Sequence, residues 1–229
     1  MASPTSPPLV IAVSGHRALH AGECARLRTQ LSDALAAIAH AAPLDCLSAL
    51  AAGADQLFAE QVLALQERLG VQRVRLLAPL PMPEAAYIAS QEQPGSTAFR
   101  DSYLALCARA QAVFEVPADG GPPDGAAPYV RLGDYLAAHA GLLVALWDGD
   151  TDAARQPGGT FDVVMRYLAM PGHVVVHLPV RRAGSTDDAA DTLPALLTLD
   201  HAGRLQRDEE PAALARYVAG RASPVTRLD

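Results

Sequence analysis

The sequence predicts an α/β fold with a Rossmann-like, mostly parallel central sheet of about six or seven strands and helices on both faces. Three observations predict it. Short apolar, β-branched runs recur along the 229-residue chain, each run ends at a turn of small or polar residues, and amphipathic segments separate the runs. Strands that alternate with helices are joined by right-handed crossovers, which produce a parallel sheet.

The predicted strands are uninterrupted apolar runs, because a strand inside a parallel sheet is buried on both of its faces. The clearest run is Gly141–Trp147, and the Asp-Gly-Asp sequence at 148–150 ends it abruptly. We expect strands at Leu9–Val13, Leu44–Ser48, Arg73–Ala78, Ala112–Val116, Gly141–Trp147 and Val174–Leu178.

Helices are predicted where apolar side chains recur three or four positions apart and so share one face. Prolines at 79, 81 and 83 delay the helices after the third strand, and residues 84–110 should hold one short and one longer helix. The Gly/Pro stretch 117–128 is predicted to be a mobile surface loop. The apolar stripes are Leu27, Leu31, Leu35 and Ile38, then Phe58, Val62, Leu65 and Leu69, then residues 129–140, and finally Phe161, Val164, Met165 and Leu168.

The pattern divides the chain into a tail, one main domain and an extension. Residues 1–8 are rich in Pro and Ser and are predicted to be a disordered N-terminal tail. The α/β pattern fills 9–182, and 183–229 is expected to pack on the same domain as a C-terminal extension. Within that extension, 193–207 could form a hairpin and 211–218 a terminal helix.

One compositional fact excludes several chemistries: the chain has no lysine, so all 18 of its basic residues are arginines. A Schiff base with pyridoxal phosphate and a phosphate loop of the Gly-Lys-Ser/Thr kind both need the lysine amine. Arginine instead offers a planar fork that matches carboxylates and phosphates. Recognition of an anion therefore stays available.

The net charge of −7 predicts no DNA or RNA partner, because nonspecific binding depends on cations that displace counterions from phosphates. No apolar run approaches the roughly 20 residues that cross a bilayer, and the start lacks a signal peptide pattern. We therefore expect a cytoplasmic protein without a membrane partner. Cys24, Cys46 and Cys107 are too far apart for a metal knuckle, and the histidines lack metal spacing, so neither a metal nor a cofactor is expected.

Candidate binding residues gather where strands are predicted to end, since ligands of open parallel sheets lie beyond the carboxyl ends of the strands. The first group is Ser14, Gly15, His16 and Arg17. Gly15 would let the backbone approach a ligand, Ser14 can donate a hydroxyl hydrogen bond, and Arg17 can clamp a phosphate or carboxylate. The alternative is a structural glycine beside a surface arginine.

The second group follows the second predicted strand. Ser48 and Gly53 are candidates for lining the pocket, and Asp55 lies near the start of the next helix. An aspartate there can bind a ligand, or it can cap the helix by accepting hydrogen bonds from its first N–H groups.

The third group combines Trp147 and Asp148 at one strand end with Gly158, Gly159 and Thr160 at the next helix start. Paired glycines before a helix expose successive N–H groups at the positive end of its dipole, which favours phosphate binding.

Two carboxylates are candidates for catalysis. Asp162 and Asp148 are best placed to engage a ribose hydroxyl or to act as general acid or base, although each could instead cap a helix or form a turn. Of the histidines, only His16 lies in a candidate turn. His139, His173 and His177 are assigned to packing or solvent.

Taken together, these pieces resemble the SLOG superfamily, Rossmann-like proteins that include the lysine-decarboxylase-like phosphoribohydrolases and nucleotide-sensing domains of bacterial conflict systems. The matching segments are Ser14–Arg17, Ser48–Asp55, Leu146–Gly149 and Gly158–Thr160, and they span most of Leu9–Arg182. The resemblance implies a nucleotide or nucleotide-derived ligand whose phosphate is held at Gly158 and Gly159. Because related folds often complete their pockets through dimer contacts, a homo-oligomer stays open as an alternative.

The sequence departs from the enzymes of that superfamily, whose signature is Pro-Gly-Gly-x-Gly-Thr-x-Glu-Glu. Here Pro157–Asp162 is shorter by two residues, Asp162 falls where the first glutamate would, and Val163 replaces the second. Two hypotheses follow. The favoured one is a binding or sensing module. The alternative is an N-glycoside hydrolase for nucleoside monophosphates, in which Asp162 or Asp148 stabilises the oxocarbenium ion and Arg17 holds the phosphate.

Overall fold

A computed structural model describes residues 7–118, 125–151, 156–185, 193–210, 212–214 and 216–217. The strands are β1 (Leu9–Gly15), β2 (Leu44–Leu47), β3 (Val74–Leu80), β4 (Ala112–Glu115), β5 (Leu142–Trp147), β6 (Val175–Pro179), β7 (Ala195–Leu199) and β8 (Leu205–Asp208). The helices are the 3-10 helix η1 (Ala21–Glu23) and the α-helices α1 (Cys24–Ala41), α2 (Ala54–Leu69), α3 (Glu84–Gln91), α4 (Ala98–Cys107), α5 (Ala127–His139) and α6 (Thr160–Leu168).

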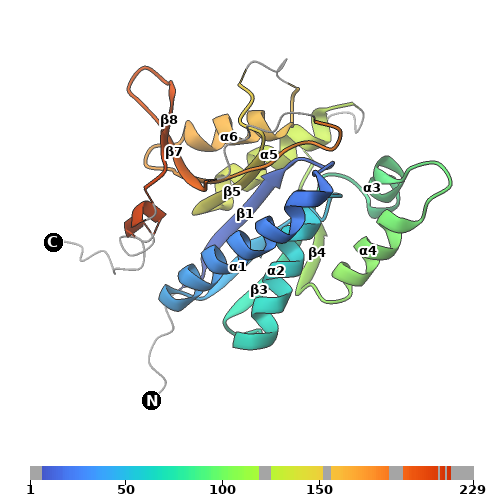
Figure 1. Cartoon of the computed structure of the whole chain (residues 1–229). Helices are drawn as coiled ribbons and strands as arrows, with labels where there is room; N and C mark the ends of the chain where they lie inside the picture. The colour runs from blue at the N-terminus through green and yellow to red at the C-terminus, as the bar shows by residue number, and fades with distance from the viewer. Residues whose placement is uncertain are drawn as a thin grey trace.

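The strands form one sheet in the order β4-β3-β2-β1-β5-β6-β7-β8 (Figure 1). The first six strands pair in parallel, whereas β7 is antiparallel to β6 and β8 to β7. The fold is therefore the predicted Rossmann-like one with a mostly parallel sheet. It has 8 strands rather than six or seven, because both strands of the hairpin near the C-terminus join the same sheet.

Helices cover both faces of the sheet, and the strands alternate between two cores. Ile11 and Val13 of β1 pack in the cluster that includes α1, α2, α3 and α4, while Ala12 between them packs with α5 and α6. Successive strand residues point to opposite faces, so an apolar run is needed to fill both cores. This is why the buried strands could be found as uninterrupted apolar segments.

The order of strands reverses next to β1. From β1 the chain proceeds outward to β2, β3 and β4, then returns to place β5 on the other side of β1. The loops that leave β1 and β5 therefore run to opposite faces and separate, which opens a crevice at the carboxyl ends of these two strands. The fold itself thus sets the place where a ligand can bind.

Several expectations fall partly or wholly outside the described residues. Of the predicted tail only Pro7 and Pro8 are described, and the predicted mobile loop includes the undescribed residues 119–124. The hairpin expected within 193–207 is present as β7 and β8, and 212–214 and 216–217 are helical. None of the helices among the described residues is both long and apolar enough to cross a membrane.

Candidate functional site

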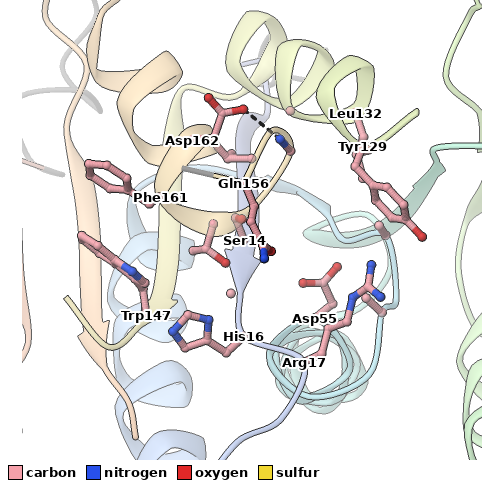
Figure 2. Close-up of a pocket in the computed structure, with 18 of the residues that line it drawn as sticks. Ser14, His16, Arg17, Asp55, Tyr129, Leu132, Trp147, Gln156, Phe161 and Asp162 are labelled. Carbon is pink, nitrogen blue, oxygen red and sulfur yellow. Dashed lines mark hydrogen bonds between the residues drawn. The ribbon is translucent and has the colours of Figure 1, made fainter. Parts of the chain in front are cut away.

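A cavity of about 670 Å³ lies at the carboxyl ends of β1 and β5, where the strand order reverses. The turns after β1, β2 and β5 line it together with the N-terminal ends of α5 and α6 (Figure 2). Its volume is within the range of small-molecule sites. Ten of the residues singled out from the sequence line this cavity: Ser14, Gly15, His16, Arg17, Asp55, Trp147, Gly158, Gly159, Thr160 and Asp162.

The turn after β1 is held close to both neighbouring elements. The His16 N–H donates to the carbonyl oxygen of Leu146 at 3.0 Å, which extends the pairing of β1 with β5. A Cβ added at Gly15 would lie 2.4 Å from the Cβ of Ala54, the first residue of α2. Gly15 therefore allows α2 to begin directly beside β1, and this brings the turns after β1 and β2 to one cavity.

Arg17 presents an exposed guanidinium group to the cavity, and neutral groups hold it in place. Its Cζ lies 5.1 Å from the ring centroid of Tyr129, a cation-π contact. In the amide orientation that satisfies its hydrogen bonds, the Gln91 side-chain oxygen accepts from both terminal nitrogens of Arg17 at 3.2 Å. Among the described residues Arg17 forms no salt bridge, whereas Arg182 at the same cavity pairs with Asp148. The positive charge of Arg17 is thus left for an anion.

Asp55 lies at the second residue of α2, and its carboxyl group faces the cavity beside Arg17 (Figure 2). Gly53 occupies the N-cap position, so the alternative of Asp55 as the N-cap is not what the structure has. The side chain is almost buried, with 8% of the residue exposed. Burial raises the pKa of Asp55 to about 7, although backbone hydrogen bonds from Ala51 and Ala49 and the charge of Arg17 oppose the rise.

Ser48 and Gly53, also singled out from the sequence, are not among the residues that line the cavity. The buried Ser48 hydroxyl donates to the carbonyl oxygen of Asp55 at 3.0 Å and accepts from the N–H of Leu50 at 3.2 Å. Gly53 has a φ of 80°, and a Cβ there would lie 2.3 Å from the carbonyl oxygen of Arg17. Both residues therefore shape the turn that positions Asp55.

Residues 156–159, which we call the glycine turn, are closed by one hydrogen bond within the turn and one to Asp162 of α6. The Gly158 N–H donates to Oδ2 of Asp162 at 2.8 Å, the dashed line in Figure 2, and the Gly159 N–H donates to the carbonyl oxygen of Gln156 at 2.9 Å. Gly158 has a φ of 75°, and a Cβ there would lie 2.6 Å from the Cβ of Tyr129. Gly158 lets the turn pack on α5, and the amides of both glycines already have acceptors in the turn or in α6.

The first turn of α6 lines the cavity directly after the glycine turn, from Thr160 to Asp162. The positive end of the helix dipole is therefore directed at the cavity, where it favours an anion. Asp162 does not stand free: its Oδ2 also accepts from Nε of Arg166 at 3.0 Å, and Arg166 binds Asp134 at 2.7 Å. This carboxylate fastens the glycine turn to α6.

Asp148 is not among the residues that line the cavity. Its Oδ2 accepts from Nε of Arg182 at 2.6 Å, and its Oδ1 accepts from the N–H of Asp150 at 3.2 Å. Burial would raise the pKa of Asp148, but hydrogen bonds with Arg182 and His16 outweigh it and hold the pKa below its usual value. Asp148 is therefore an ionised partner of Arg182.

His16 lines the cavity and is paired with the same residue. Its Nε2 lies 3.2 Å from the backbone nitrogen of Asp148 and 3.1 Å from Oδ1 of that residue. Burial lowers the pKa of His16 below its usual value, although Asp148 opposes the change. With a proton on Nε2 the ring donates to Oδ1 of Asp148, and without that proton it accepts from the N–H of Asp148.

An aromatic wall closes the side of the cavity beside β5. The indole ring of Trp147 is stacked on Phe161, with ring centroids 5.4 Å apart, and only 2% of Trp147 is exposed. Sequence reasoning missed Phe161, Gln156, Tyr87 and Tyr129 as lining residues. Tyr129, directly after the Gly/Pro stretch, indicated only where a helix starts, because no local sequence pattern shows that α5 faces Arg17.

No group of three or more His, Cys, Asp or Glu side chains that could hold a metal ion occurs within the part of the chain that the structure describes. The three histidines assigned to packing or solvent have ring or backbone contacts. His139 stacks on Tyr135, His173 lies against Tyr167, and His177 is bound to the carbonyl oxygen of Trp147.

No protein-family model matches the chain, and no curated protein matches its sequence. Among solved structures, the chain is similar to the X-ray structure of DNA processing protein A (DprA) from Streptococcus pneumoniae. The two are 13% identical, with a TM-score of 0.47. The similarity covers 93% of this chain, which spans 56% of the DprA chain.

The expectation of no DNA partner is contradicted by the printed name of that protein, DNA processing protein A, whereas the expectation of no RNA partner stays a prediction. The expectation rested on the net charge of −7, which is a sum over the whole chain. Binding to phosphates depends instead on where cations stand on the surface. Net charge was therefore too coarse a quantity to exclude this class of partner.

Proposed function

We propose that this chain is a SLOG-type module that binds or senses a nucleotide or nucleotide-derived small molecule in the cavity at the ends of β1 and β5. The observation that carries the proposal is the position of Arg17. Its guanidinium has no carboxylate partner among the described residues, and it lines the same cavity as the first turn of α6. An anionic ligand supplies the charge that both groups lack.

The size and lining of the cavity support a ligand larger than a free phosphate. A volume of about 670 Å³ accommodates a nucleoside as well as its phosphate. The aromatic wall of Trp147 and Phe161 offers an apolar surface, while Ser14, Gln156 and Thr160 offer hydrogen-bonding groups. The resemblance of the turns to the SLOG superfamily supports the same ligand class.

Binding is better supported than hydrolysis, because the two candidate catalytic carboxylates are already engaged. Asp162 accepts from the Gly158 N–H and from Arg166, and Asp148, which does not line the cavity, accepts from Arg182. Neither carboxylate is free of protein partners, as a carboxylate that contacts a sugar ring would be. We therefore propose that nucleotides leave the site unchanged.

Isothermal titration calorimetry tests the proposal. The probes are AMP, ADP-ribose, a cyclic dinucleotide and a short single-stranded DNA, with adenosine as the neutral counterpart of AMP. We expect heat from at least one of the anionic small molecules and markedly weaker binding of adenosine. Chromatography of the recovered nucleotide should show no free base. Absence of heat from every nucleotide would refute the proposal, and free base would replace it with the hydrolase.

The matched variants are Arg17→Gln and Arg109→Gln. Loss of a charge-assisted hydrogen bond should weaken binding about tenfold or more in Arg17→Gln. Arg109 is an exposed arginine that pairs with Glu67 away from the cavity, so its replacement should leave the affinity unchanged. Equal losses in both variants would show that the net charge, and not this site, attracts the nucleotide.

A further inference from the structure

Asp55 is a buried acid in a cavity that, by the proposed function, takes an anion. Its carboxyl group lines the cavity on the same side as Arg17, and Figure 2 shows the two side chains next to each other. Neither residue forms a salt bridge among the described residues, although the Arg17 charge acts on Asp55. An ionised Asp55 would repel the ligand that Arg17 attracts, so the protonation state of this carboxyl decides what the cavity accepts.

The groups around Asp55 hold its ionised form only weakly. The β2–α2 turn supplies the backbone N–H groups of Ala49 and Ala51, and the turn after β1 supplies Arg17. From α3 comes Tyr87, whose pKa burial raises well above its usual value and which therefore stays neutral. From α5 comes Tyr129, which lies under the Arg17 guanidinium.

Binding of an anion would change this balance in one direction. A phosphate that pairs with Arg17 uses the cation whose charge favours the carboxylate, and it places a second negative charge beside that carboxylate. Both effects favour the neutral acid. The neutral acid has an O–H group that can donate to a phosphate oxygen, which a carboxylate cannot do.

We propose that Asp55 is a specificity-determining residue that contacts the ligand as the neutral acid and donates a hydrogen bond to the anionic group paired with Arg17. The proposal rests on the proposed function, and it adds the chemistry of recognition. The site would then recognise a phosphoryl group through the cation of Arg17 and the O–H donor of Asp55. Where Asp55 is ionised in the free protein, each binding event takes up one proton from solvent onto the Asp55 carboxylate.

The experiment is calorimetric titration with AMP between about pH 7.5 and about pH 9, in two buffers that differ in ionisation enthalpy. The second pKa of a phosphate monoester is near 6, so AMP does not change its charge in this range. Because the pKa of Asp55 in the free protein is about 7, the affinity should fall by nearly tenfold per pH unit. The difference between buffers should give close to one proton taken up per AMP bound.

Asp55→Asn and the exposed Asp33→Asn are the matched variants. The side-chain amide introduced by Asp55→Asn keeps a hydrogen-bond donor and has no titration. The affinity of this variant should therefore be flat with pH, exceed that of the wild type at about pH 9, and involve no proton uptake. Asp33→Asn should behave as the wild type. Far-UV circular dichroism checks that each variant is folded. The proton uptake of the wild type tests the proposal even if a variant fails to fold.

The outcomes separate the two proposals. AMP binding with no proton uptake and no pH dependence would overturn the role of Asp55 and leave the nucleotide site standing. Affinity that rises with pH would also overturn it, because Asp55 would then act as an ionised acceptor. Failure of AMP and of inorganic phosphate to bind at any pH, including about pH 6 where the acid is mostly neutral, would overturn this proposal together with AMP as a ligand of the site.

Discussion

The two sides of the cavity, the Arg17 side and the glycine turn, have similar packing but different chemical groups. On one side, Gly53 at positive φ packs against the backbone of Arg17, and on the other, Gly158 at positive φ packs against Tyr129. The first arrangement leaves Arg17 without a carboxylate partner among the described residues and Asp55 with a raised pKa. In the glycine turn, by contrast, the Gly158 N–H donates to the Asp162 carboxylate of α6 and the Gly159 N–H donates to Gln156.

The difference teaches that a glycine-rich turn before a helix is not by itself a phosphate site. Such a turn binds an anion only if its N–H groups are left for the ligand, since each backbone donor has to be satisfied once. Here the Gly158 N–H is satisfied by Asp162 of α6, and the Gly159 N–H is satisfied within the turn. We therefore assign the binding of an anion in the proposed site to Arg17, Asp55 and the first turn of α6.

The largest expected effect concerns the charge on the Asp55 side. Folding raises the pKa of Asp55 from its ordinary value near 4 to about 7, so the folded protein holds this proton more tightly than the unfolded chain. The stability that this group contributes is complete below about pH 4, falls as the pH rises, and is lost above about pH 7. Over that range the free energy of unfolding of the wild type, relative to Asp55→Asn, should fall by up to about 4 kcal/mol.

Urea unfolding of the two proteins at several pH values measures this. Asp148 and Glu23 have pKa values held below their usual range and titrate with the opposite sign, but both are present in each protein and cancel in the difference. If the two curves run parallel from about pH 4 to about pH 8, Asp55 is not the buried acid that distinguishes this side of the cavity.

A second, smaller effect tests the packing of the glycine turn. Gly158 and Gly172 have the same φ of 75°, but a Cβ would meet Tyr129 at Gly158 and would meet nothing within 4 Å at Gly172. Gly172→Ala should cost only the conformational strain, about 1 kcal/mol. Gly158→Ala adds a clash with the start of α5 and should cost about 3 kcal/mol.

Thermal unfolding separates the two variants, with about 2 to 4 °C expected for each kcal/mol in a chain of this size. In Gly158→Ala the displaced Tyr129 should also weaken nucleotide binding, because its ring supports Arg17. Equal shifts in melting temperature for both variants would mean that the turn is not packed against α5, and the likeness between the two sides of the cavity would be lost.

Much of the fold could be predicted because it rests on local patterns. Each parallel strand is buried on two faces and is therefore an apolar run that ends within a few residues of the observed limit, as with the run predicted at Gly141–Trp147 and observed as β5. The count of strands was harder to predict, because the exposed β8 lacks such a run. The sequence indicated the hairpin that contains it only as a possibility within residues 193–207.

The site could be placed from the sequence, but not its chemistry. The rule that ligands lie beyond the ends of parallel strands predicted that Ser14, Asp55 and Thr160 would lie near each other, and all three line one cavity. The contact of Tyr129 with Arg17 joins segments far apart in the chain, and the raised pKa of Asp55 depends on burial that only tertiary packing creates. For the same reason, net charge could not decide the question of a DNA partner.

The smallest of the expected effects tests whether Asp162 is a structural carboxylate. Asp162→Ala removes the acceptor of the Gly158 N–H and of Arg166, and loss of these charge-assisted hydrogen bonds should cost about 2 kcal/mol. Asp134→Ala removes an exposed partner of the same arginine and should cost less than about 0.5 kcal/mol. Urea denaturation measures both. A role in binding would give a different result. If Asp162→Asn keeps the stability of the wild type but abolishes the heat of AMP binding, the carboxylate contacts the ligand. The glycine turn would then take part in binding as much as the Arg17 side does.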